Sequence, residues 1–81
     1  MSSSSSSPYR IDATGLHCPM PLLKLKQALH QLPPGTQILL IASDPNSQTD
    51  IQRFCQIAGH QVQMQTNNTQ GFEFLIQKAN S

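Results

Sequence analysis

One stretch of the chain combines a cysteine with two closely spaced prolines. Cys18 is followed by Pro19 and Pro21, and apolar residues at helical spacing begin at Leu22. Proline is favoured in the first turn of a helix, because the N–H that it lacks would have no partner there. The spacing predicts that Cys18 immediately precedes a helix, with Pro19 at the first helical position. The positive end of the helix dipole would then lower the pKa of the Cys18 thiol and favour a reactive thiolate.

The same prolines limit how a thiolate could be held. Neither proline donates a hydrogen bond, so the N–H of Met20 is the expected donor to the sulfur. His17 could act as a base towards the thiol, although neighbours in sequence often face apart. Lys24 and Lys26 could raise the local positive potential or attract an acidic partner, or they could simply face solvent. The roles of His17 and of the two lysines stay open at this point.

The other cysteine and the other histidines are interpreted as structural. Cys55 shares an apolar stripe with Phe54 and Ala58, His30 falls late on a helix, and His60 follows a glycine that ends one. No spacing of His, Cys, Asp and Glu resembles a zinc site, so no metal is expected. No secretion signal is recognisable, and we expect both thiols to be free.

The elements that must position the cysteine alternate between strand and helix patterns. Residues 9–13 alternate polar and apolar side chains, which predicts a strand with one buried face. Residues 22–32 carry leucines at helical spacing and predict an amphipathic helix that two prolines end. The apolar run within residues 36–42 is short and lies between turn signals, which favours a central strand.

A second helix is predicted in the middle of the chain. Residues 44–46 predict a turn, and Ser47 followed three residues later by Asp50 resembles a capping box. We therefore expect a second helix to follow this capping box, with Ile51, Phe54, Cys55 and Ala58 on one face. Gly59 is well placed to end it in a left-handed conformation.

The last part of the chain predicts a hairpin that completes the fold. Residues 61–65 and 72–77 alternate like strands, and hairpin-like residues join them. A right-handed crossover makes the strands that flank a helix parallel. The order therefore predicts an α/β fold, a two-layer βαβαββ sandwich with two helices packed on one face of a four-stranded mixed sheet.

Composition sets the limits on domain organisation and partners. The chain has 81 residues and a net charge of +1, and only 11% of its residues are charged. Residues 1–8 predict a disordered serine-rich tail, and residues 9–79 predict a single domain. No apolar run approaches the roughly 18 residues that span a bilayer. We expect a cytoplasmic monomer that binds neither membranes nor, strongly and directly, nucleic acids.

With these residues in view, the chain resembles the TusA (SirA-like) sulfur-carrier family over residues 11–78. The most specific part is residues 12–24, which contain the family's Cys-Pro-x-Pro signature at Cys18. Four later pairs also fit the family pattern: Asp44-Pro45, Asp50-Ile51, Phe54-Cys55 and Gly59-His60.

This resemblance implies a function for Cys18. The cysteine would accept sulfane sulfur from a donor such as a cysteine desulfurase or a rhodanese-like protein, hold it as a persulfide, and pass it to an acceptor protein. Family members supply sulfur for 2-thiouridine of transfer RNA, for molybdenum-cofactor synthesis or for other sulfur-trafficking pathways. The resemblance implies a persulfide relay that needs no cofactor. Whether such a sulfurtransferase-type carrier counts as an enzyme stays open.

Two alternatives remain. A non-catalytic interaction or regulatory module, which could bind RNA through its sheet, would not need the thiol of Cys18. The low basic content weighs against RNA binding. A thiol redox sensor would need a resolving thiol nearby, for which Cys55 on a core face is poorly suited.

Overall fold

The computed structural model of the chain describes residues 8–69 and 71–79. Of the tail predicted at residues 1–8, only the exposed Pro8 falls within the described residues. The elements follow in the order β1 (Tyr9–Ala13), α1 (Met20–Gln31), β2 (Gln37–Ala42), α2 (Pro45–Ala58), β3 (Gln61–Asn68) and β4 (Gly71–Gln77).

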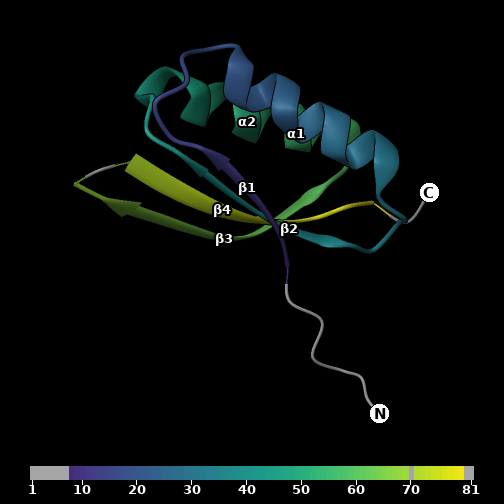
Figure 1. Cartoon of the computed structure of the whole chain (residues 1–81). Helices are drawn as coiled ribbons and strands as arrows, with labels where there is room; N and C mark the ends of the chain where they lie inside the picture. Colours follow the sequence, from purple (N-terminus) through teal and green to yellow (C-terminus); the bar gives the residue numbers. More distant parts are fainter. Residues whose placement is uncertain (1–7, 70, 80–81) are drawn as a thin grey trace.

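The four strands form one mixed sheet in the order β1-β2-β4-β3. β1 runs parallel to β2 across the α1 crossover, whereas β4 is antiparallel to both β2 and β3. Both helices lie on the same side of this sheet (Figure 1). The predicted two-layer α/β fold is confirmed.

The core lies between the two layers and follows from the alternation of the strands. In β2 and β4 every second side chain is buried, and these side chains meet the apolar stripes of the helices. The buried apolar residues are Ile11, Ala13, Leu25, Ala28, Leu29, Ile38, Leu40, Ala42, Ile51, Cys55, Phe72, Phe74 and Ile76. Cys55 packs in this core as predicted, but Ala58, expected on the same buried face, is exposed at the helix end.

The starts of both helices differ from the prediction. α1 begins at Met20, and Pro19 occupies the capping position before it instead of the first helical position. α2 begins at Pro45, so the capping box expected at Ser47 is wrong. Asp44 caps α2 instead, and its carboxylate accepts a hydrogen bond from the N–H of Asn46 at 3.1 Å. An aspartate followed by proline is the stronger start signal, because it supplies both the cap and a first residue that needs no N–H partner.

Two glycines have conformations that fix the ends of elements. Gly59 ends α2 with a φ of 85°, which confirms the predicted left-handed cap. Gly71 has a φ of 153°, and a Cβ atom there would lie 2.2 Å from the backbone oxygen of Ala42. β4 therefore begins in direct contact with the end of β2.

Within the described ranges, no helix is long and apolar enough to cross a membrane.

Candidate functional site

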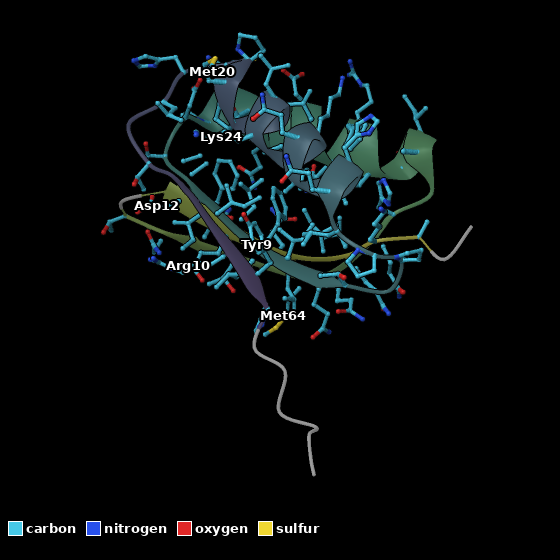
Figure 2. All side chains as sticks on the ribbon, turned by 45° about the vertical axis from the view of Figure 1, so that its right-hand side comes forward. Tyr9, Arg10, Asp12, Met20, Lys24 and Met64 are labelled. Atoms are coloured by element: carbon cyan, nitrogen blue, oxygen red, sulfur yellow. The ribbon has the colours of Figure 1, made fainter. Side chains whose placement is uncertain are left out.

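Cys18 lies where the loop after β1 meets the start of α2. β1 and β2 are parallel and pair as far as Ala13 and Ala42, so the segments that follow them leave the sheet side by side. One of these segments contains Cys18 and the other leads to Asp44. The Cys18 side chain is exposed, as predicted. Met20, two residues further along, marks this end of the molecule in Figure 2.

Two hydrogen bonds fasten the cysteine loop to the segment before α2. The N–H of Gly15 donates to the Ser43 hydroxyl oxygen at 2.9 Å, and the N–H of Cys18 donates to Asp44 Oδ2 at 2.7 Å. Asp44 thus uses one carboxylate oxygen to cap α2 and the other to hold Cys18. The hydrogen bond from the Cys18 N–H is the main cause that lowers the pKa of Asp44, and those from Asn46 and the nearby charge of His17 lower it further.

The sulfur of Cys18 faces carboxylates. Its thiol donates a hydrogen bond to Asp50 Oδ2, with 2.8 Å between sulfur and oxygen. This hydrogen bond, followed by desolvation and by the negative charges of Asp50 and Asp44, raises the pKa of the Cys18 thiol. The predicted lowering of this pKa is therefore wrong, because the dipole of α1 is not the field that governs the sulfur.

A buried hydroxyl lies beside the same sulfur. Ser47 is the third residue of α2 and has no exposed surface. Within residues 8–69 and 71–79, its Oγ atom has no hydrogen-bond partner. Ser47 nevertheless acts on Cys18 as a hydrogen-bonding group, in the direction that lowers the pKa of the thiol. The two statements agree if the hydroxyl bonds to the sulfur only in its anionic form.

The Met20 N–H and the His17 side chain, both considered as groups that could assist Cys18, make other interactions. The N–H of Met20 donates to the backbone oxygen of His17 at 2.8 Å, so it is not the donor to the sulfur that the sequence predicts. The His17 side chain is exposed, and its charge acts on Asp44. His17 therefore lies near Asp44, the residue that accepts the hydrogen bond from the Cys18 N–H.

The two lysines of α1 are not among the groups that shift the pKa of Cys18. The Lys26 ammonium lies 5.2 Å from the centre of the Phe54 ring, in a cation–π contact between the helices. Lys24 is exposed and lines a shallow hollow with Tyr9 and Arg10, and Figure 2 labels all three.

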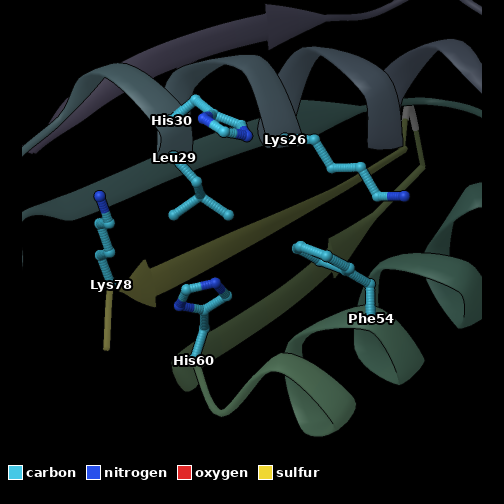
Figure 3. A pocket seen from close by; sticks show the side chains of 6 residues that line it. All are labelled: Lys26, Leu29, His30, Phe54, His60 and Lys78. Carbon is cyan, nitrogen blue, oxygen red and sulfur yellow. The ribbon is translucent and has the colours of Figure 1, made fainter. Parts of the chain in front are cut away.

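A separate pocket of about 390 Å³ lies between the two helices, and Cys18 is not part of its lining. It is lined by Lys26, Leu29, His30, Phe54, His60 and Lys78, and Figure 3 shows Leu29 and His60 pointing towards each other across it. The Lys78 ammonium donates to the backbone oxygen of Leu32, and His60 Nδ1 accepts a hydrogen bond from the N–H of Ala79 at 3.0 Å. These contacts fasten residues 78 and 79 to the ends of the two helices, and His60 has the structural role predicted for it.

Sequence reasoning missed Asp44, Ser47 and Asp50 as parts of the site. The pattern that could have found them was present, since Asp44 and Pro45 form a helix start. In a helix that begins there, Ser47 and Asp50 fall on one face. The part of the chain that the structure describes has no group of three or more His, Cys, Asp or Glu side chains that could hold a metal ion.

This chain is similar to known proteins over most of its length. The family described as sulfurtransferase TusA matches residues 9–78. The sulfur carrier protein TusA of Pseudomonas fluorescens (strain SBW25) is 38% identical over 68 residues, which cover 84% of this chain and 82% of that protein. The protein of the same name from Pseudomonas putida (strain GB-1) is also 38% identical over 68 residues, which cover 84% of this chain and 85% of the relative.

A solved structure supports the fold independently. The crystal structure of a SirA-like protein from Desulfitobacterium hafniense superposes with a TM-score of 0.74 and covers 90% of this chain and 99% of its own, at 24% sequence identity. Because the family match spans most of the chain and the named relatives align over most of their length, this chain belongs to the TusA family.

Proposed function

We propose that this protein is a sulfur carrier that accepts sulfane sulfur as a persulfide on Cys18 and relays it to an acceptor protein. Relatives named sulfur carrier protein TusA support the carrier role. The observation that carries the assignment to Cys18 is its exposed thiol in the signature loop, fastened through its own N–H to Asp44. Cys55, the other cysteine, is buried. We also propose that residues 9–79 form one domain.

The relay needs only thiol chemistry. The Cys18 thiol loses its proton, and the resulting thiolate attacks the terminal sulfur of a persulfide on the donor. A new S–S bond forms at Cys18 as the S–S bond of the donor breaks, and the donor cysteine leaves as a thiolate. An acceptor thiolate then attacks the terminal sulfur on Cys18 in the same way. Each step begins and ends with one thiol and one persulfide, so neither an oxidant nor a reductant is required.

The environment of Cys18 suits a carrier that is activated in a complex. The hydrogen bond to Asp50 raises the pKa of the thiol and keeps the free protein in the thiol form. A thiol reacts with electrophiles more slowly than a thiolate, which protects an exposed cysteine between encounters. A donor protein that surrounds the site would change the charges that act on Cys18.

The proposed partners are a cysteine desulfurase or a rhodanese-like protein as donor, and a downstream sulfur-acceptor protein. The pathway served is 2-thiolation of transfer RNA, molybdenum-cofactor synthesis or another sulfur-trafficking route. The proposed carrier is a cytoplasmic monomer that meets its partners transiently.

A two-stage labelling experiment tests the relay. The protein is incubated with a cysteine desulfurase and [³⁵S]cysteine, separated from the donor, and mixed with candidate acceptor proteins. We expect label on the wild type and on Cys55→Ser, none on Cys18→Ser, and loss of label from the carrier as an acceptor gains it. Equal label on Cys18→Ser would overturn the assignment. Full biological activity of Cys18→Ser would instead favour the interaction module.

A further inference from the structure

The hydroxyl of Ser47 is buried without a hydrogen-bond partner among the described residues. Ser47 is also the one fully buried polar side chain within those residues. An unpaired hydroxyl that is closed off from water destabilises the fold. Most such groups are paired, so one that lies beside a reactive sulfur needs a reason.

The position of Ser47 supplies that reason. Ser47 is in the first turn of α2, and Asp50 lies three residues later on the same side of the helix. The single proton of the Cys18 thiol is directed to Asp50 Oδ2. A neutral thiol is a weak hydrogen-bond acceptor, so the Ser47 hydroxyl has little to bond to while that proton is in place.

The situation changes when the sulfur loses its proton. A sulfur anion is a strong acceptor, and a hydroxyl already buried beside it can donate without being taken out of water. The direction in which Ser47 acts on the Cys18 pKa, opposite to that of Asp50, agrees with this arrangement. The first turn of α2 also presents the positive end of its dipole to the same region.

We propose that Ser47 is the hydrogen-bond donor that stabilises the anionic sulfur of Cys18 during sulfur transfer. In the forward step Sγ releases its proton to solvent, and the Ser47 hydroxyl donates to the sulfur anion. The anion attacks the terminal sulfur of the donor persulfide, and the leaving donor thiolate takes up a proton from solvent. The overall change is Cys18–SH plus R–S–SH giving Cys18–S–SH plus R–SH. This inference rests on the proposed carrier function.

The test compares Ser47→Ala with Ser47→Thr, which keeps the hydroxyl. Loading of Cys18 from glutathione persulfide is followed by mass, and alkylation of Cys18 by iodoacetamide is followed as a function of pH. We expect Ser47→Ala to load about tenfold more slowly or worse, since donors to a developing anion commonly contribute that much or more. We expect its alkylation profile to move to higher pH by about one unit, and Ser47→Thr to stay within about threefold of the wild type in both measurements.

Thermal unfolding separates this role from a structural one. Because the hydroxyl is unpaired in the resting protein, Ser47→Ala should melt at the wild-type temperature or above it. A clearly lower melting temperature, or wild-type loading with an unshifted alkylation profile, would overturn the inference. If the wild type itself does not load from the persulfide, the carrier function fails instead. The alkylation profile still decides the role of Ser47 in that case, because it does not depend on sulfur transfer.

Discussion

The thiol of Cys18 donates a hydrogen bond to the carboxylate of Asp50, which lies 32 residues further along the chain. This contact joins the loop before α1 to the first turns of α2. The sulfur therefore takes its electrostatic environment from the second helix, although it immediately precedes the first. Asp44 reinforces the same junction through the backbone N–H of Cys18.

Replacing Asp50 by asparagine should make Cys18 more reactive. The Asp50 carboxylate accepts the thiol proton and repels a thiolate, so its removal lowers the pKa of Cys18 towards its ordinary value. More thiolate is then present near neutral pH, and alkylation by iodoacetamide should accelerate roughly three- to tenfold there. The control is Asp12→Asn, because the Asp12 carboxylate bonds to Thr14 and not to the thiol. An unchanged or slower rate in Asp50→Asn alone would contradict the assigned contact.

Loss of the Asp44 side chain should destabilise the junction between the cysteine loop and α2. Asp44→Ala removes the acceptor of two backbone N–H groups, and a fall of about 3–8 °C in melting temperature is expected near neutral pH. Asp44→Asn, which can still cap a helix, should lose less.

The same carboxylate predicts a pH dependence of stability. Its pKa is lower in the folded protein than the ordinary value of 3.8, so its contribution is present above that value and is lost as the pH falls through the folded pKa. Melting temperatures of the wild type and Asp44→Ala should therefore draw together as the pH falls below 3.8. A constant difference at all pH values would show that Asp44 acts through something other than its charge.

A side chain at position 71 should be poorly tolerated. Gly71→Ala places a Cβ atom against the backbone oxygen of Ala42, which cannot rotate away, and should cost about 1–3 kcal/mol in urea denaturation. Gly15→Ala is the matched control, since Gly15 also has a positive φ but nothing lies within 4 Å of the added atom. The control should cost only about 1 kcal/mol from backbone strain. Equal losses in both variants would rule out the contact with Ala42 as the cause.

The two cysteines should differ sharply in reactivity. Cys55 is 1% exposed, and burial raises the pKa of its thiol to about 11. The native protein should therefore take up one alkyl group near pH 8, on Cys18, and two only after unfolding in urea. Peptide mapping of the alkylated protein measures this directly. Rapid modification of Cys55 in the native protein would show that the core opens readily or is packed differently.

The fold could be read from local patterns because the buried faces of the elements repeat at the spacing of strands and helices. The alternation of β2 and β4 and the leucines of α1 specify which sides meet. The position of an exposed Cys18 between β1 and α1 could be read as well, but the exact start of α1 could not. These are properties of neighbouring residues.

The environment of Cys18 could not be read in the same way. Ser47 and Asp50 have the spacing of a capping box, in which Ser47 would precede the helix. The same spacing places two side chains on one face of a helix that begins earlier. Only the observed start of α2 at Pro45 shows that the second interpretation is right. The predicted direction of the thiol pKa is wrong because the dipole of α1 and the lysines near Cys18 in sequence are not the groups that govern the sulfur. Carboxylates that approach from α2 depend on how the two helices pack on the sheet.

The mass of the intact protein after sulfur loading tests the central claim most directly. Wild type, Cys55→Ser and Cys18→Ser are each incubated with a cysteine desulfurase and cysteine, and measured without reductant. We predict a gain of about 32 Da, one sulfur atom, on the wild type and on Cys55→Ser, and no gain on Cys18→Ser. An unchanged mass of the wild type after incubation with every class of sulfane-sulfur donor, or the same gain on Cys18→Ser, would contradict the account.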